Sequence, residues 1–167
     1  MQGFLDAPIV LGIDPGTTQT AYALWNGQQV VECGLVPNEQ MHDMLCGEKW
    51  PGVPMFIEMV ASYGMAVGKE IFQTVFWIGR FVEVWDIKQQ DWKLVYRLEV
   101  KLHHCHSARA KDANVSQALR DKYGEVGTKK QPGPLFGVKK DIWSALAIAT
   151  FAHETFRSSK QYDVPTA

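Results

Sequence analysis

Three acidic side chains stand out because each falls where a rigid element of the chain is expected to end or begin. Asp14 closes the apolar segment 9–13 and is followed by a turn-forming Pro-Gly pair. Glu58 interrupts an apolar run, and Asp141 precedes an apolar helical pattern. Carboxylates held rigidly at such positions are ligands for hard cations such as Mg²⁺. Each also has an ordinary alternative, namely a turn residue, a solvent-facing strand residue or a helix cap.

The three carboxylates become informative when they are considered together. If they converge from two strands and one helix, they repel one another unless cations lie between them. Two Mg²⁺ ions about 4 Å apart stabilise the attacking and leaving oxygens of a phosphodiester displacement. The pattern therefore predicts Mg²⁺-dependent phosphodiester chemistry, with Mn²⁺ as a substitute.

The elements that must position these acids follow from the spacing of apolar residues. Strands are predicted at residues 9–14, 20–26, 28–36, 53–60 and 94–104, and helices at 39–46, 66–87, 112–123 and 139–157. Asn26-Gly27 favours a hairpin, and Asn38 is expected to cap the first helix. Together these elements predict an α/β fold with a five-stranded mixed sheet flanked by helices.

The composition predicts a single domain, residues 1–157, and a disordered tail, residues 158–167. Hydrophobic residues make up 46% of the chain and charged residues 21%, which is typical of a soluble globular protein. No segment approaches the roughly 20 apolar residues of a membrane span, and no signal-peptide pattern is present. The three scattered cysteines agree with a reducing compartment. A cytoplasmic location without membrane contact is therefore expected.

Charge is distributed unevenly along the chain. Residues 1–60 contain one basic and seven acidic side chains, a net charge of −6, whereas residues 88–140 contain twelve basic and five acidic side chains, a net charge of +7. A positive segment of this kind is typical either of a surface that follows a phosphate backbone or of an ordinary solvated face. Charge alone does not separate the two.

Two further patterns have competing explanations. The aromatic residues of the predicted helix 66–87 are Phe72, Phe76, Trp77 and Phe81. Aromatic residues at this spacing usually belong to a core, but they offer more surface than one sheet face is expected to cover, which predicts a homodimer built on this helix. The run 103–106, His-His-Cys-His, suggests zinc, but it lacks a second ligand pair at fixed spacing, so a zinc site is not favoured.

Several stretches resemble the RuvC-like Holliday junction resolvases. The three acidic motifs of that family are matched by Gly12-Ile13-Asp14-Pro15-Gly16, Ile57-Glu58 and Asp141-Ile142-Trp143-Ser144-Ala145-Leu146-Ala147. The bacteriophage branch is matched further by residues 61–65, 109–113 and 132–135. The resemblance covers most of residues 8–153. It implies a ribonuclease H-like fold, a homodimer, and Mg²⁺-dependent nicking of four-way DNA junctions.

The resemblance also implies roles for individual residues. Asp14, Glu58 and Asp141 match the metal ligands of the family. The last motif of the bacterial family has two acids three residues apart, whereas this chain has Ser144 at the second position. Ser144 and Asp112 are therefore candidates for a further ligand.

The remaining candidate residues are basic or aromatic. Lys111 lies where the family has a catalytic lysine, although the Lys-Asp order here shifts the match by one position. Tyr63 lies in a loop that the resemblance places near the DNA. The candidate DNA-contacting residues are Tyr63, Lys69, Lys101, Arg109, Lys129, Lys130, Lys139 and Lys140.

Two functions from different classes are consistent with these features. The first is a structure-selective endonuclease that resolves four-way junctions and other branched DNA by paired symmetric nicks. The second is a non-catalytic protein that binds branched DNA and keeps the same fold, which Ser144 motivates. A nucleotide-binding protein of the actin-like kind begins with a similar turn, but it would need two later glycine-rich phosphate loops and more than 167 residues.

Overall fold

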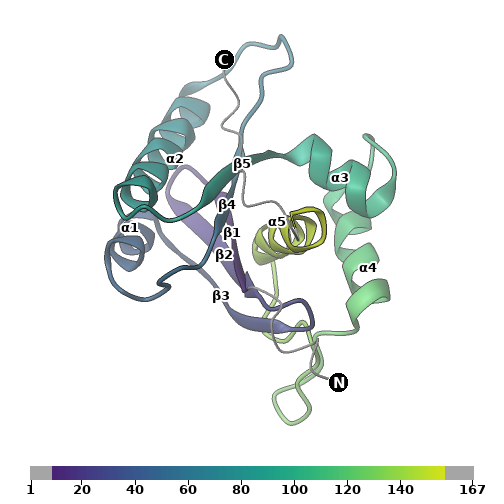
Figure 1. Ribbon diagram of the computed structural model, residues 1–167. Helices are drawn as coiled ribbons and strands as arrows, with labels where there is room; N and C mark the ends of the chain where they lie inside the picture. Colours follow the sequence, from purple (N-terminus) through teal and green to yellow (C-terminus); the bar gives the residue numbers. More distant parts are fainter. Residues whose placement is uncertain (1–8, 157–167) are drawn as a thin grey trace.

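The computed structural model describes residues 9–156, which form a mixed five-stranded sheet with helices on both faces (Figure 1). The strands are β1 (Val10–Pro15), β2 (Gln19–Trp25), β3 (Val30–Pro37), β4 (Met55–Met59) and β5 (Trp92–Tyr96). The helices are α1 (Asn38–Cys46), α2 (Lys69–Ile87), α3 (Arg97–Cys105), α4 (Asp112–Tyr123) and α5 (Ile142–Thr155). Residues 1–8 and 157–167, which include the predicted tail, lie outside the described residues.

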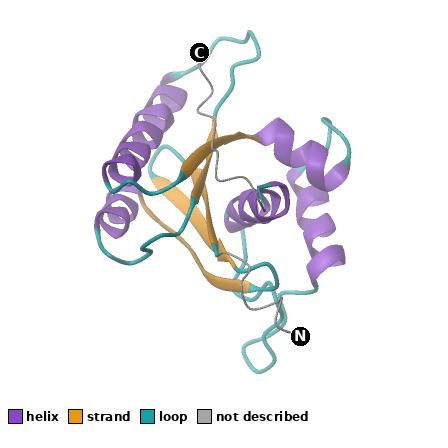
Figure 2. Cartoon of the chain, in the orientation of Figure 1, coloured by secondary structure: helices purple, strands orange, loops and turns teal. Residues whose placement is uncertain are grey.

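The sheet has the order β3-β2-β1-β4-β5, with β1 at its centre. The first three strands are antiparallel, and β4 and β5 run parallel to β1. Helices α1 and α2 cover one face, and α3, α4 and α5 lie on the other (Figure 2). This arrangement confirms the expected α/β fold with a five-stranded mixed sheet.

Alternation along β1 explains why the sheet is buried on both faces. Leu11 and Ile13 belong to the apolar cluster shared with α1 and α2, whereas Val10 belongs to the cluster around α5. Successive side chains of a strand point to opposite faces, so Gly12 and Asp14 face α5. A Cβ atom at Gly12 would lie 2.3 Å from the carbonyl oxygen of Ala145, so α5 packs directly on the strand backbone there.

The predicted strand 94–104 is wrong. The chain leaves the sheet at Tyr96, and α3 begins at Arg97. The backbone N–H of Tyr96 donates to the Glu99 carboxylate at 2.8 Å, which satisfies a donor at the helix start. The neighbouring strand β4 ends at Met59, opposite Tyr96, so no partner is available to extend β5 further. The other predicted elements lie within three residues of their observed bounds.

The predicted role of Asn38 as a helix cap is also wrong. Pro37 occupies the cap position of α1, and no side chain caps that helix. The Asn38 side chain is buried, and its amide donates to the carbonyl oxygen of Gly16 at 3.0 Å. The Thr20 hydroxyl donates to the Asn38 side-chain oxygen at 2.6 Å. Asn38 therefore fixes the turn that follows Asp14.

Candidate active site

Asp14 and Glu58 lie at the ends of adjacent parallel strands. Ile13 pairs with Ile57 across β1 and β4, so the two acids follow as the next residues on each strand. Phe56 packs in the cluster around α5, and Glu58, two residues later, faces the same side of the sheet. Both carboxylates therefore project from the face that α5 covers.

The third acid, Asp141, caps the start of α5 on that same face. Its carbonyl oxygen accepts hydrogen bonds from the backbone N–H groups of Ser144 and Ala145 at 3.0 and 3.4 Å. The contact between Gly12 and Ala145 places this end of α5 beside the end of β1. The structure therefore brings Asp14, Glu58 and Asp141 to one side of the sheet, as predicted.

The pKa of Asp14 shows that the three acids share one electrostatic environment. Burial, followed by the charges of Glu58 and Asp141, raises the pKa of Asp14 from 3.8 to a net value of about 7. Arg97 and a hydrogen bond with Ser144 act in the opposite direction. The pKa of Glu58 is also raised, first by burial, against the lowering effect of Arg97. Buried negative charge at this site is thus incompletely compensated.

A pocket opens beside Glu58, where the first turns of three helices meet. Its lining residues are Glu58, Arg97, Val100, Lys101, Asp112, Val115, Trp143, Ser144 and Ala147. Arg97, Asp112 and Ser144 come from the first turns of α3, α4 and α5, respectively. Helix N-termini carry partial positive charge, so this pocket is suited to anionic groups such as a phosphate.

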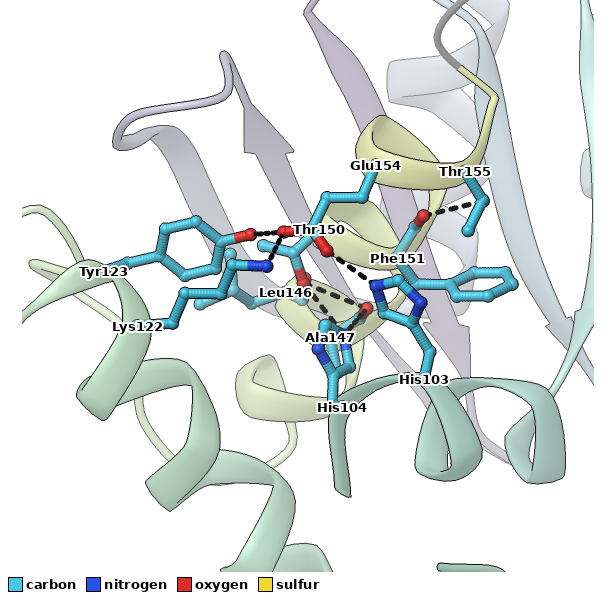
Figure 3. Close-up of polar contacts among 10 residues, drawn as sticks. All are labelled: His103, His104, Lys122, Tyr123, Leu146, Ala147, Thr150, Phe151, Glu154 and Thr155. Atoms are coloured by element: carbon cyan, nitrogen blue, oxygen red, sulfur yellow. Dashed lines mark hydrogen bonds and ion pairs between the residues drawn. The ribbon is translucent and has the colours of Figure 1, made fainter. Parts of the chain in front are cut away.

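A second cluster holds these helices to one another (Figure 3). The Glu154 carboxylate of α5 receives a hydrogen bond from the Tyr123 hydroxyl group and pairs with Lys122 at 2.5 Å, both on α4. His103 of α3 contacts the same carboxylate at 2.6 Å, and a ring nitrogen of His104 lies 2.9 Å from the Ala147 carbonyl oxygen. Both histidines thus face α5, and the cluster fixes the positions from which Arg97, Asp112 and Ser144 reach the pocket.

Comparison with known proteins identifies the fold. No protein-family model and no curated protein matches the sequence. RuvC of Thermus thermophilus superposes with a TM-score of 0.68 at 14% identity, over 89% of this chain and 97% of that chain. T. thermophilus RuvC in complex with a Holliday junction substrate superposes with a TM-score of 0.66 at 16% identity, over 90% and 95% of the two chains. The chain has a RuvC-like fold.

This result confirms the expected ribonuclease H-like fold. At 14–16% identity, the likeness shows the fold alone. Among residues 9–156 of this RuvC-like chain, no helix is long and apolar enough to cross a membrane.

Arg97 is a pocket residue that the sequence pattern missed. Its Nε atom lies 3.4 Å from the Glu58 carboxylate, and the ion pair is partly exposed. The sequence pattern predicts a strand at Arg97, because alternating apolar residues continue through it. Glu99, three residues after Tyr96, is the signal that could have indicated a helix start here.

The other predicted basic residues are distributed unevenly over the RuvC-like fold. Lys101 lines the pocket and lowers the pKa of Glu58. Lys111, directly before Asp112, is exposed and does not line the pocket. Lys139 and Lys140 are exposed just before Asp141.

Four of the remaining basic residues lie outside the pocket as well. Arg109 is exposed between α3 and α4, and Lys69 begins α2. Lys129 and Lys130 occupy the tip of a turn closed by a hydrogen bond from the Thr128 N–H to the Gln131 carbonyl oxygen at 2.9 Å. That loop contacts Val30, at the end of the sheet opposite Asp14.

Tyr63 is 69% exposed, so its side chain is not packed beneath the loop that carries it. The N–H of Met65 donates to the Ser62 carbonyl oxygen at 2.9 Å, and both central residues of this turn have positive φ, 48° for Tyr63 and 80° for Gly64. A bulky residue in this backbone region is strained. The turn therefore holds the tyrosine ring outward.

The donor set suits a hard divalent cation. Carboxylate oxygens from rigid elements are the ligands that Mg²⁺ prefers, and the raised pKa of Asp14 reflects buried negative charge that a cation would compensate. In residues 9–156 no group of three or more His, Cys, Asp or Glu side chains is arranged to hold a metal ion as it stands.

Proposed function

We propose that this chain is a metal-dependent endonuclease that cleaves branched DNA, four-way junctions above all, by paired symmetric nicks. The observation that carries the proposal is the position of Asp14 and Glu58 at the ends of adjacent strands, electrostatically coupled to Asp141 at the start of α5. The RuvC-like fold supports it, because a T. thermophilus RuvC with this fold is known in complex with a Holliday junction substrate.

Asp14, Glu58 and Asp141 would hold Mg²⁺ or Mn²⁺, with Asp112 and Ser144 as candidates for a further ligand. The metal, when bound, would stabilise charge on the oxygens of the reacting phosphodiester. Without a cation, the raised pKa leaves about half of the Asp14 carboxyl groups protonated near pH 7.

The basic residues around the pocket would bind the scissile phosphate and neutralise charge during cleavage. Lys101 and the N-termini of α3, α4 and α5 would bind the scissile phosphate. Lys111, beside Asp112, would approach the phosphate from the pocket rim and neutralise charge that develops during cleavage. The exposed lysines outside the pocket would follow the duplex arms, because phosphate contacts position a protein on DNA without reading its sequence.

Oligomeric state, partner and location belong to the same proposal. Phe72 and Phe76 are 65% and 63% exposed on α2, although Phe81 of the same helix is fully buried. An apolar patch of this kind supports a homodimer through α2, which would present two sites to a two-fold-symmetric junction. We place the protein in the bacteriophage branch of the resolvases and in the cytoplasm of an infected cell.

A non-catalytic branched-DNA-binding protein is the second candidate. Ser144 supports it, because the acidic set contains a hydroxyl group at the position where the resemblance expects a carboxylate. This candidate predicts junction binding without nicking in either Mg²⁺ or Mn²⁺.

One experiment separates the two candidates. Wild-type protein and the variant Asp14→Asn are compared for binding to a four-way junction and for nicking of that junction in Mn²⁺ and in EDTA. We expect Asp14→Asn to abolish nicking and to keep or improve binding, since removing a carboxylate lowers repulsion of phosphate. Asp43→Asn, the same change at an exposed site on α1, is the matched control.

Wild-type protein that binds the junction and never nicks it would reject the nuclease proposal. Nicking by Asp14→Asn within about tenfold of wild type, roughly 1.4 kcal/mol of barrier, would instead reject Asp14 as a central metal ligand.

A further inference from the structure

We propose that the hairpin 127–132 binds the phosphate backbone of one duplex arm about seven base pairs from the acidic site, so that an arm must be at least that long to be fully bound. The inference rests on the proposed function, because it takes the substrate to be branched DNA. It adds the path of one arm over the protein and the length of arm that the protein holds.

The hairpin is a fixed structure. The N–H of Thr128 donates to the Gln131 carbonyl oxygen at 2.9 Å, and the N–H of Gln131 donates to the Thr128 hydroxyl oxygen at 3.1 Å. Gly127 pairs with Pro132 across the base of the same turn. Two lysines at the tip of such a turn are therefore presented at a defined place, which a freely moving loop would not provide.

The segment that follows the hairpin runs beside β3 toward the acidic site. The N–H of Val30 donates to the Pro134 carbonyl oxygen at 2.9 Å, and a Cβ atom at Gly137 would lie 3.2 Å from the Cys33 sulfur. The two contacts are three residues apart on both the strand and the segment, so the two run in the same direction. Leu135 between them is fully buried in the apolar cluster around α5, which attaches the segment to the core.

The charge of this part of the chain has a single sign. Residues 126–140 contain four lysines and no acidic residue. The four are Lys129 and Lys130 at the tip of the hairpin and Lys139 and Lys140 just before Asp141, and all are exposed. Within residues 9–156, no carboxylate forms an ion pair with any of them. Unpaired cations that begin beside the acidic site and end at the hairpin tip match the regularly spaced negative charges of a duplex backbone.

The length of the strands sets the distance between the acidic site and the tip. Asp14 and Val10 are four residues apart on β1, which is about 13 Å, and Val10 lies level with Val30 across β2. Lys130 precedes Pro134 by four residues, so the tip lies up to about 13 Å further away. In Figure 1 the loop between α4 and α5 projects from the body of the protein at the bottom of the view. The total of about 25 Å corresponds to about seven base pairs at about 3.4 Å each.

The test uses a four-way junction with arms of about 15 base pairs, in which chosen phosphates are replaced by uncharged methylphosphonates. Binding is measured by fluorescence anisotropy in EDTA, so that no metal supports cleavage. Neutral linkages roughly six to eight base pairs from the branch should weaken wild-type binding about tenfold. The same replacement roughly eleven to thirteen base pairs from the branch should have little effect, because those phosphates lie beyond the tip.

Two variants assign this effect to the hairpin. Lys129→Gln/Lys130→Gln should bind the unmodified junction about tenfold more weakly than wild type, and the nearer neutral linkages should cost it less than about twofold. Its affinity should also depend less on salt, with a slope of log affinity against log salt that is smaller by about two per chain. Lys129→Arg/Lys130→Arg keeps both charges and should behave as wild type. Both positions are exposed, and circular dichroism checks that each variant is folded.

Wild-type binding that is unaffected by the nearer neutral linkages would overturn the inference. An equal loss for wild type and Lys129→Gln/Lys130→Gln on those linkages would overturn it as well. A protein that shows this arm contact but never nicks the junction in Mn²⁺ would reject the nuclease proposal and leave the inference standing. Nicking without the arm contact would do the reverse, and a wild type that binds no junction would reject both.

Discussion

The hydroxyl group of Thr20 and the side-chain oxygen of Asn38 are joined by a buried hydrogen bond of 2.6 Å. The same asparagine donates to the carbonyl oxygen of Gly16, and its backbone N–H donates to that of Thr18 at 3.0 Å. One side chain thus satisfies polar groups on both sides of the turn after Asp14. The position of the first carboxylate depends on a residue that does not itself take part in the chemistry.

Asn38→Ala should lower the free energy of unfolding by about 1–3 kcal/mol, because it leaves the Thr20 hydroxyl and the Gly16 carbonyl without their partner. Urea unfolding followed by circular dichroism measures the change. The double variant Thr20→Val/Asn38→Ala should recover part of the loss, since one unpaired group is then removed. A loss below about 0.5 kcal/mol for Asn38→Ala would show that the turn holds without this bond.

Asp14 should make the metal-free protein less stable as the pH rises. Its pKa is about 7 in the folded protein and near 3.8 in the unfolded chain, so between these values the folded state binds more protons. Relative to wild type, the free energy of unfolding of Asp14→Asn should therefore increase by between about 1 and 4 kcal/mol from pH 5 to pH 8.

Thermal unfolding of both proteins across this pH range measures the difference. Comparing the two cancels the opposing contribution of His104, whose lowered pKa destabilises the folded state as the pH falls below about 6.5. At pH 8, Mg²⁺ should stabilise wild type and leave Asp14→Asn nearly unchanged. If the stabilities of the two proteins depend on pH in the same way, the pKa of Asp14 does not differ between the folded and unfolded states.

The placement of the three acidic residues on one side of the sheet could be predicted because Asp14 closes an apolar segment, Glu58 interrupts one and Asp141 precedes one. Glu58 is the clearest example, since a carboxylate within an apolar strand demands an explanation. The sheet could be predicted as well, because the alternation along β1 and β2 is regular and the Asn26-Gly27 turn is specific. Local pattern and final structure agree wherever a segment has only one way to bury its apolar residues.

Arg97 and Asn38 could not be predicted, because their roles are decided by distant parts of the chain. The alternation of apolar residues around Arg97 fits a strand. Strand β4 ends at Met59, however, so a longer β5 would have no strand to pair with beyond Tyr96. Asn38 has the residue type of a helix cap, but the buried groups of Gly16 and Thr20 compete for its side chain. In both cases a tertiary contact overrides a correct local preference.

Tyr63 should contribute to junction binding by stacking on bases exposed where the arms part. Tyr63→Gly should weaken binding to a four-way junction by the equivalent of about 1–3 kcal/mol, with little change for linear duplex. It should not lower the melting temperature, because glycine adopts a positive φ without strain. Tyr63→Phe, which keeps the ring, is the control. Equal losses for both DNA substrates would assign Tyr63 to general DNA contact.

The exposed apolar patch formed by Phe72 and Phe76 on α2 should form the interface of a homodimer. Wild-type protein should give about twice the 18.8 kDa chain mass by light scattering at micromolar concentration. Phe72→Glu/Phe76→Glu should give the monomer mass, because four buried charges at the centre of an interface are strongly unfavourable. Val31→Glu, at a 49% exposed position on β3, is the control. A monomeric wild type would contradict the dimer.

Because Gly12 packs against Ala145, the acidic site can assemble only after α5 has been synthesised. Strand β1 leaves the ribosome early, whereas α5, which covers it and brings Asp141, is the last element of the described chain. Until α5 docks, the central strand lacks its cover and the acidic set lacks a member. The proposed endonuclease would therefore be inert until α5 has been made, and a copy terminated before α5 would not cut DNA.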